Sequence, residues 1–143
     1  MKTTARNQFH GVVKSIHSGA TNDEVIVDIG GGLEVVAGIT QSSTKRLGLE
    51  EGKEVLAFVK APWIILARHS ADYEFSTRNL FVGEIVDLKE GAVNSEVFIR
   101  VNDEVELVAI IANESVKNLD LFVGENIKAL FKAPHVILAT KKA

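Results

Sequence analysis

The stretch Arg6-Asn7-Gln8-Phe9-His10-Gly11 decides the fold, because it returns 72 positions later as Arg78-Asn79-Leu80-Phe81-Val82-Gly83. The same offset pairs two further segments, Gly19-Ala20-Thr21-Asn22 with Gly91-Ala92-Val93-Asn94 and Lys60-Ala61-Pro62 with Lys132-Ala133-Pro134. Similarity at one fixed period indicates duplication of a structural unit. We therefore predict two tandem copies, at 1–69 and 76–143, with a short polar linker at 70–75.

Within each copy the hydrophobic pattern is mainly that of β-strands. In the first copy we predict strands at 9–16, 24–29, 33–39, 55–59 and 63–67, and a short helix over 40–47. Gly30-Gly31-Gly32 supplies the positive-φ freedom that a hairpin turn needs, and Asn102-Asp103 replaces it in the second copy. This order predicts a mainly β protein of two tandem OB-like five-stranded Greek-key barrels, each with a short helix. One such small barrel buries only about 60% of its unfolded surface, so we expect packing between copies or chains.

The composition is that of an ordinary globular protein, with 46% hydrophobic and 24% charged residues among 143. The chain has no cysteine, which excludes disulfides, thiolate metal sites and cysteine nucleophiles. No secretory signal and no apolar run long enough to cross a bilayer are visible, so we expect a cytoplasmic protein without a membrane partner. The net charge of −3 is spread along the chain, which argues against a broad nucleic-acid footprint.

The first polar segment that both copies share places a hydroxyl two residues before an arginine. Thr4 precedes Arg6, and Ser76 precedes Arg78, so that in an extended chain both side chains lie on one side. Arginine presents fixed donors that fit an oxyanion. The alternative is a solvated arginine at the start of a strand, with the following asparagine making a local turn.

A second shared segment places a lysine and a free alanine N–H before a proline. Proline biases the residue before it toward an extended conformation, so the amide of Ala61 or Ala133 can point at a ligand beside the ammonium of Lys60 or Lys132. The alternative is a proline that ends a strand at the barrel edge.

Two further segments offer free backbone amides. Ser43 and Ser115 lie at the predicted helix starts, where N–H groups and a hydroxyl suit an anion, although ordinary capping is the better explanation of this segment taken alone. The Gly-Ala-x-Asn turns can also direct amides at an anion, or can be plain connections. Their candidate residues are Ala20, Asn22, Val93 and Asn94. The four segments together supply hydroxyls, cations and amides with almost no carboxylate, which favours a doubly negative tetrahedral anion.

These segments, together with Leu-Gly-Leu-Glu-Glu-Gly-Lys-Glu-Val at 47–55, resemble the molbindin (Mop-type, TOBE-related) molybdate-binding domain, twice over. The resemblance implies an OB-like barrel per copy, a homotrimer with a ring of six copies, and oxyanion sites at interfaces between copies. It implies one class of sites that binds through Thr4, Arg6, Ser43, Lys60, Ala61, Ser76, Arg78, Ser115, Lys132 and Ala133. It implies a second class near the threefold axis at Ala20, Asn22, Val93 and Asn94.

The implied function is non-covalent binding of molybdate, and of tungstate, for intracellular storage, buffering or homeostasis, without a catalytic cofactor and without direct ligation of a metal cation. The main alternative is an OB-fold nucleic-acid-binding protein, which needs exposed aromatics as stacking platforms. Phe9, Phe58, Phe81 and Phe131 instead fall in core-like patterns. A third alternative is a regulatory domain detached from a transporter ATPase or a transcription factor, which would need partners.

An enzyme is disfavoured because no catalytic motif is present and the four histidines show no zinc-ligand spacing. None of these histidines recurs in the other copy, and we expect each to be solvated or hydrogen-bonded. Glu24 and Glu96 do recur, and we expect them to be solvated or bonded to backbone rather than catalytic.

Overall fold

The computed structural model of the chain describes residues 2–69 and 72–142. The first repeat contains β1 (Asn7–Ser18), β2 (Asn22–Gly30), β3 (Leu33–Thr40), α1 (Gln41–Arg46), β4 (Glu54–Val59), the 3-10 turn η1 (Ala61–Trp63) and β5 (Ile65–Arg68). The second contains β6 (Leu80–Glu90), β7 (Asn94–Arg100), β8 (Glu106–Ala112), α2 (Asn113–Asn118), β9 (Asn126–Leu130), η2 (Ala133–His135) and β10 (Ile137–Ala139). The predicted mainly β architecture is confirmed, with the helix between the third and fourth strands of each repeat.

Two local differences from prediction concern the ends of elements. The strand predicted from Trp63 begins only at Ile65, because Pro62 occupies the first turn of η1 and its fixed φ favours that turn. The predicted linker 70–75 starts with Ser70 and Ala71, which lie outside the described residues, and no helix or strand is formed over 72–75.

The β2–β3 hairpin shows how the local sequence sets the fold. Val25 and Val27 alternate with exposed or half-buried neighbours and are fully buried. The strand ends at Gly30-Gly31-Gly32, where φ is +91°, +62° and +76°. These values favour glycine. The carboxylate of Asp28 accepts a hydrogen bond from the N–H of Gly30 at 2.9 Å and fixes the turn.

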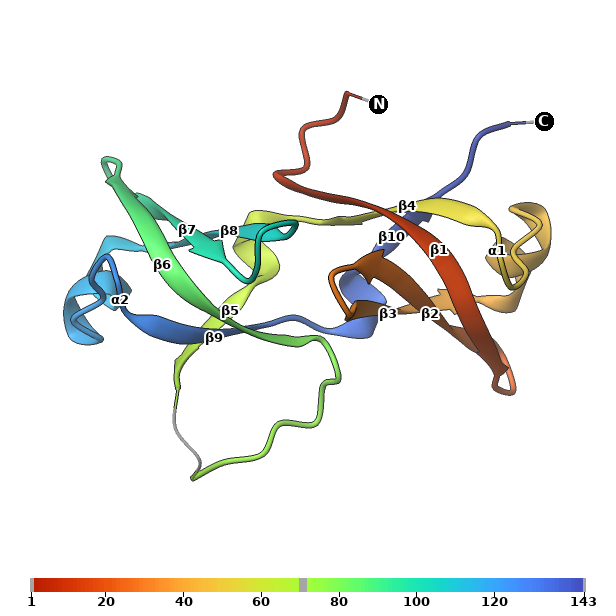
Figure 1. Ribbon diagram of the computed structural model, residues 1–143, viewed down its shortest axis with the longest axis horizontal. Coiled ribbons are helices and arrows are strands. Elements are labelled where there is room, and N and C mark those ends of the chain that lie inside the picture. Colours follow the sequence, from red (N-terminus) through yellow and green to blue (C-terminus); the bar gives the residue numbers. More distant parts are fainter. Residues whose placement is uncertain (1, 70–71, 143) are drawn as a thin grey trace.

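The last strand of each repeat joins the barrel of the other repeat. One sheet has the order β10-β4-β1-β2-β3 and the other has the order β5-β9-β6-β7-β8. Leu138 in β10 pairs with Ala57 in β4, and Leu66 in β5 pairs with Ala129 in β9. Figure 1 shows β10 beside β4 in one half of the molecule and β5 beside β9 in the other. The boundaries 1–69 and 76–143 remain predictions for the two sequence repeats. Neither barrel is built from one repeat alone, because each takes one strand from the other repeat.

The 3-10 turns carry the chain from one barrel to the other. η1 packs against β8 of the second repeat, and η2 packs against β3 of the first. The rings of Trp63 and His135, which occupy equivalent positions, lie 4.7 Å apart between their centroids. The buried side chains of both repeats form one hydrophobic cluster. The expected packing between copies is thus achieved by strand exchange and by a shared core.

The predicted core positions of four phenylalanines are confirmed, since all are less than 9% exposed: Phe9, Phe58, Phe81 and Phe131. Within the described part of the chain, neither helix is long or apolar enough to span a membrane.

Candidate functional site

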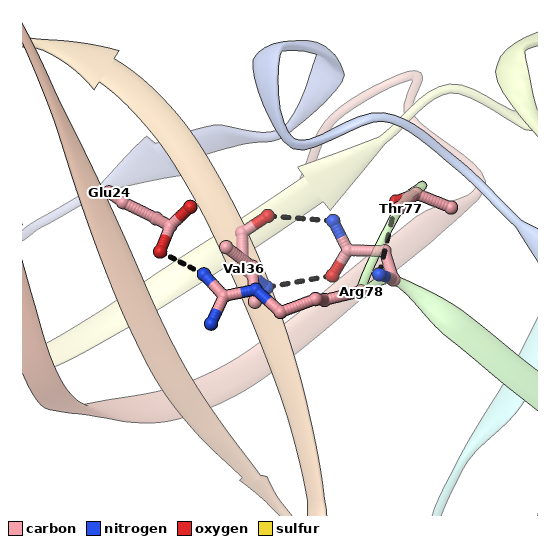
Figure 2. A network of polar contacts seen from close by, with 5 residues as sticks. Glu24, Val36, Thr77 and Arg78 are labelled. Atoms are coloured by element: carbon pink, nitrogen blue, oxygen red, sulfur yellow. Dashed lines mark hydrogen bonds and ion pairs between the residues drawn. The ribbon is translucent and has the colours of Figure 1, made fainter. Parts of the chain in front are cut away.

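A buried asparagine fixes the chain directly after each candidate arginine. The side chain of Asn79 donates to the carbonyl of Val36 and accepts from its N–H, both at 2.7 Å. The hydroxyl of Thr77 accepts from the N–H of Asn79 at 3.1 Å and donates to the carbonyl of Phe131 at 2.7 Å. Arg78 lies between these two anchored residues (Figure 2).

The first repeat has the same pair of asparagine hydrogen bonds, which corrects the alternative that the asparagine makes a local turn. Asn7 bonds to the N–H and the carbonyl of Val108 at 2.7 and 2.8 Å. Asn7 and Asn79 are 1% and 0% exposed, so they do not make a local turn. Each joins the start of one repeat to the third strand of the other, because a buried amide must satisfy both its donor and its acceptor.

Each candidate arginine forms an ion pair with a glutamate of the other repeat. Nη2 of Arg78 donates to Oε1 of Glu24 on β2 (Figure 2). Nη2 of Arg6 donates to Oε2 of Glu96 on β7 at 3.0 Å. The hydrogen bond from Arg6 lowers the pKa of Glu96 and raises the pKa of Arg6. These glutamates are partly solvated as expected, with side chains 43% and 36% exposed, but their partners are arginines rather than backbone. Their recurrence at the 72-residue offset was the available signal.

Four predicted site residues of the second repeat line one pocket. Its cavity volume is about 200 Å³, and its lining includes Ser76, Arg78, Lys132 and Ala133 together with Glu24 of the first repeat. Lys132 and Ala133 reach it because the N–H of Phe131 donates to the carbonyl of Asn79, which holds the two segments side by side. The pocket therefore combines two cations, a hydroxyl and a backbone segment with one carboxylate.

The corresponding residues of the first repeat are held by equivalent elements. Arg6 precedes β1, and Lys60 and Ala61 enter η1, which packs against β8. Ala61 is only 1% exposed. The ammonium of Lys60 lies 5.4 Å from the centroid of the Trp63 ring. In the second repeat His135 replaces this tryptophan, and its Nδ1 is buried without a hydrogen-bond partner.

Ser43 and Ser115 are not brought to these arginines within one chain. They lie in α1 and α2, which occupy opposite ends of the long axis (Figure 1). Neither serine is among the residues that line the pocket around Arg78. Ser43 receives the cap from Thr40, whose hydroxyl accepts from the N–H of Ser43 at 3.1 Å. Ala112 provides no such cap before Ser115.

The Gly-Ala-x-Asn turns lie against the helix starts of their own barrels. Gln41 donates to the carbonyl of Gly19 at 2.6 Å, and Asn113 donates to the carbonyl of Gly91 at 3.0 Å. The four candidate residues in these turns are exposed: Ala20, Asn22, Val93 and Asn94. Asp23 follows the first turn, with its carboxylate buried and Oδ1 unpartnered, where the second repeat has Ser95. A carboxylate opposes an anion, so the first turn is the poorer site of the two.

A larger groove of about 940 Å³ runs along β4 and the C-terminal segment, but its lining includes Glu50, Glu51 and Glu54. These three carboxylates outnumber the two lysines of the lining, Lys53 and Lys141, so the groove suits a dianion less well than the pocket around Arg78. In the part of the chain that the structure describes, no group of three or more histidine, cysteine, aspartate or glutamate side chains could hold a metal ion.

The sequence of the chain is similar to that of known protein families and relatives. The TOBE domain matches the chain over residues 3–66 and again over 76–138. The chain is 35% identical, over 99% of its length, to the molybdenum transport protein ModE of Herbaspirillum seropedicae, and 34% identical, over 97%, to the molybdenum-pterin-binding protein MopA of Rhodobacter capsulatus. It spans only about half of these relatives, 53% and 52% of their lengths.

A solved structure matches over the full length of both chains. The chain is 40% identical to the cytoplasmic molybdate-binding protein ModG, whose structure holds bound molybdate. The match covers 99% of this chain and 100% of that one, with a TM-score of 0.93.

Proposed function

We propose that this chain, which belongs to the TOBE domain family in its two-copy, Mop-type (molbindin) form, binds molybdate non-covalently and catalyses no reaction. The observation that carries the proposal is the pocket where Ser76, Arg78, Lys132 and Ala133 converge. The full-length similarity to ModG, a protein with molybdate bound, supports the choice of ligand.

The chemistry of the pocket suits a tetrahedral dianion. Arg78 offers planar paired donors, Lys132 a compact positive charge and Ser76 a hydroxyl, while the N–H of Ala133 can complete the set. Hydrogen bonds from charged donors are roughly twice as strong as neutral ones, and so they replace the water shell of the anion. Cavity size then selects molybdate, and tungstate of similar size, over the smaller sulfate.

We infer that the complete sites form between chains of a homotrimer. Ser43 and Ser115 lie in α1 and α2, the helices at the two ends of the long axis (Figure 1). Only a neighbouring chain can therefore bring them to Arg78 or Arg6. Ile65 and Ile137, on the exchanged strands, are 57% and 56% exposed, which is surface that assembly would cover. The exposed turns at Ala20, Asn22, Val93 and Asn94 supply the second class of sites in this arrangement.

The biological role we propose is intracellular storage or buffering of molybdate in the cytoplasm. We base this role on ModG, a cytoplasmic molybdate-binding protein that matches 99% of this chain at 40% identity. The chain spans about half of the ModE relatives, one of which is a DNA-binding transcriptional regulator. Phe9, Phe58, Phe81 and Phe131 are buried and so cannot stack with bases, which leaves Trp63, Tyr73, Phe75 and Phe122 as the exposed aromatics.

Isothermal titration with molybdate tests the proposal. The wild-type protein should bind several anions per trimer, and the double variant Arg78→Ala/Lys132→Ala should lose the sites of this class at the second repeat while retaining those at the first repeat. Lys14→Ala/Lys53→Ala removes the same charge outside the pocket and should bind as the wild type does. Wild-type protein without binding would refute the function, and undiminished binding by the double variant would refute the site.

A further inference from the structure

The carboxylate of Glu24 lies in the pocket that we assign to the anion. Glu24 lines the pocket with Ser76, Arg78, Lys132 and Ala133, and it is the only carboxylate among the lining residues. It is bonded to the guanidinium of Arg78 (Figure 2). An anion that enters this pocket therefore meets an arginine that already has a negative partner.

This ion pair differs from the others of the described chain because it is duplicated. Arg6–Glu96 repeats Arg78–Glu24 at the 72-residue offset, with both partners retained. The ion pair Lys14–Glu34 has no counterpart, since Val86 stands where the lysine would be. The pair Arg68–Glu125 has none either, because Thr140 and Lys53 occupy the equivalent positions. The duplicated pairs involve the two arginines of the anion motif.

The charges of the pocket show what the carboxylate does to a bound dianion. Arg78 and Lys132 together match the two negative charges of molybdate, so Glu24 leaves one negative charge in excess. The Glu24 carboxylate and a dianion in the same pocket would repel each other. Glu24 and Arg78 have side chains that are 43% and 54% exposed, so the ion pair is weak and the carboxylate can turn into water at little cost.

We propose that Glu24 and Glu96 are built-in competitors of the oxyanion. Each carboxylate neutralises its arginine while the site is empty, is displaced when the anion binds, and thereby lowers the affinity and keeps the anion exchangeable. This inference rests on the proposed function, since it concerns the same sites. If the ion pair only stabilised the fold, its loss would leave binding unchanged. If it oriented the arginine for the anion, its loss would weaken binding.

Titration of Glu24→Gln/Glu96→Gln with sodium molybdate, at fixed salt and pH, decides between these roles. The glutamine is nearly isosteric but uncharged, and we expect the dissociation constant to fall roughly three- to tenfold with unchanged stoichiometry. The matched control Glu34→Gln/Glu106→Gln removes the same charge at equivalent positions of both repeats outside the pockets, and it should bind nearly as the wild type does.

Each outcome of the titration bears on one proposal. Binding by the double variant that is no tighter than that of the control overturns the competitor role. Absence of binding by the wild type overturns the proposed function instead. The single variants Glu24→Gln and Glu96→Gln should each tighten only one of the two sets of sites.

Discussion

Asn79 forms two hydrogen bonds of 2.7 Å with the backbone of Val36, and through them the start of the second repeat is attached to the third strand of the first. Asn7 and Val108 form the same link in the opposite direction. These amides hold the two barrels in the relative position that places Arg78 opposite Glu24.

We expect Asn79→Ala to lower the free energy of unfolding by about 2–4 kcal/mol, because the N–H and the carbonyl of Val36 would stay buried without partners. Urea unfolding followed by circular dichroism measures the change. Asn118→Ala, at the exposed end of α2, is the matched control and should change stability little. A loss for Asn79→Ala no larger than for the control would mean that the link between barrels is not structural.

Strand exchange predicts that a substitution in one repeat loosens the barrel of the other. Leu138 is 7% exposed and belongs to β10, which pairs with β4 of the first repeat. Leu138→Ala should cost about 2–4 kcal/mol and should speed amide hydrogen exchange at 54–59. Leu66→Ala in β5, its equivalent, should instead speed exchange at 126–130. The reverse pattern would show that each repeat closes its own barrel.

The sequence predicted much of this fold, because the 72-residue offset and the strand pattern are local or periodic signals. It did not predict the exchange, since 65–67 and 137–139 have the same Ile-Leu-Ala sequence and either edge can accept either strand. The pocket residues of the second repeat were predicted from shared polar segments. Glu24 was not assigned to the pocket, because nothing near it in the chain indicates that it faces Arg78.

The ion pair between Arg6 and Glu96 predicts a pH-dependent part of stability. The pKa of Glu96 is lowered in the folded protein, chiefly by its hydrogen bond with Arg6, so the contribution is present above the ordinary value of 4.5 and is lost as the pH falls through the lowered pKa. Glu96→Gln should therefore melt below the wild type at pH 7 and approach it as the pH falls through the lowered pKa of Glu96.

Thermal melts at several pH values measure this difference, with Glu106→Gln as the control for a general loss of charge. A gap between the wild type and Glu96→Gln that stays constant from pH 7 to pH 3 would contradict the ion-pair explanation.

The proposed homotrimer predicts that Ser115, which is remote from the pocket within its own chain, contributes to binding in a neighbouring chain. Light scattering should give a mass three times the 15.5 kDa of the chain. Ser115→Ala should weaken molybdate binding about ten- to a hundredfold, the loss of one hydrogen bond to a charged group, without changing that mass. Ser18→Ala, at the exposed end of β1, should leave both unchanged. A monomeric mass together with full affinity in Ser115→Ala would refute assembly-dependent sites.

Diffraction from crystals grown with molybdate, recorded at the molybdenum absorption edge, tests the central claim most directly, because the anion reveals its own position. We predict an anomalous peak within hydrogen-bonding reach of the Arg78 guanidinium, the Lys132 ammonium and the Ala133 amide, with the Glu24 carboxylate turned away. Anomalous peaks only at other places, or none in crystals of a protein that binds molybdate in solution, would contradict the account.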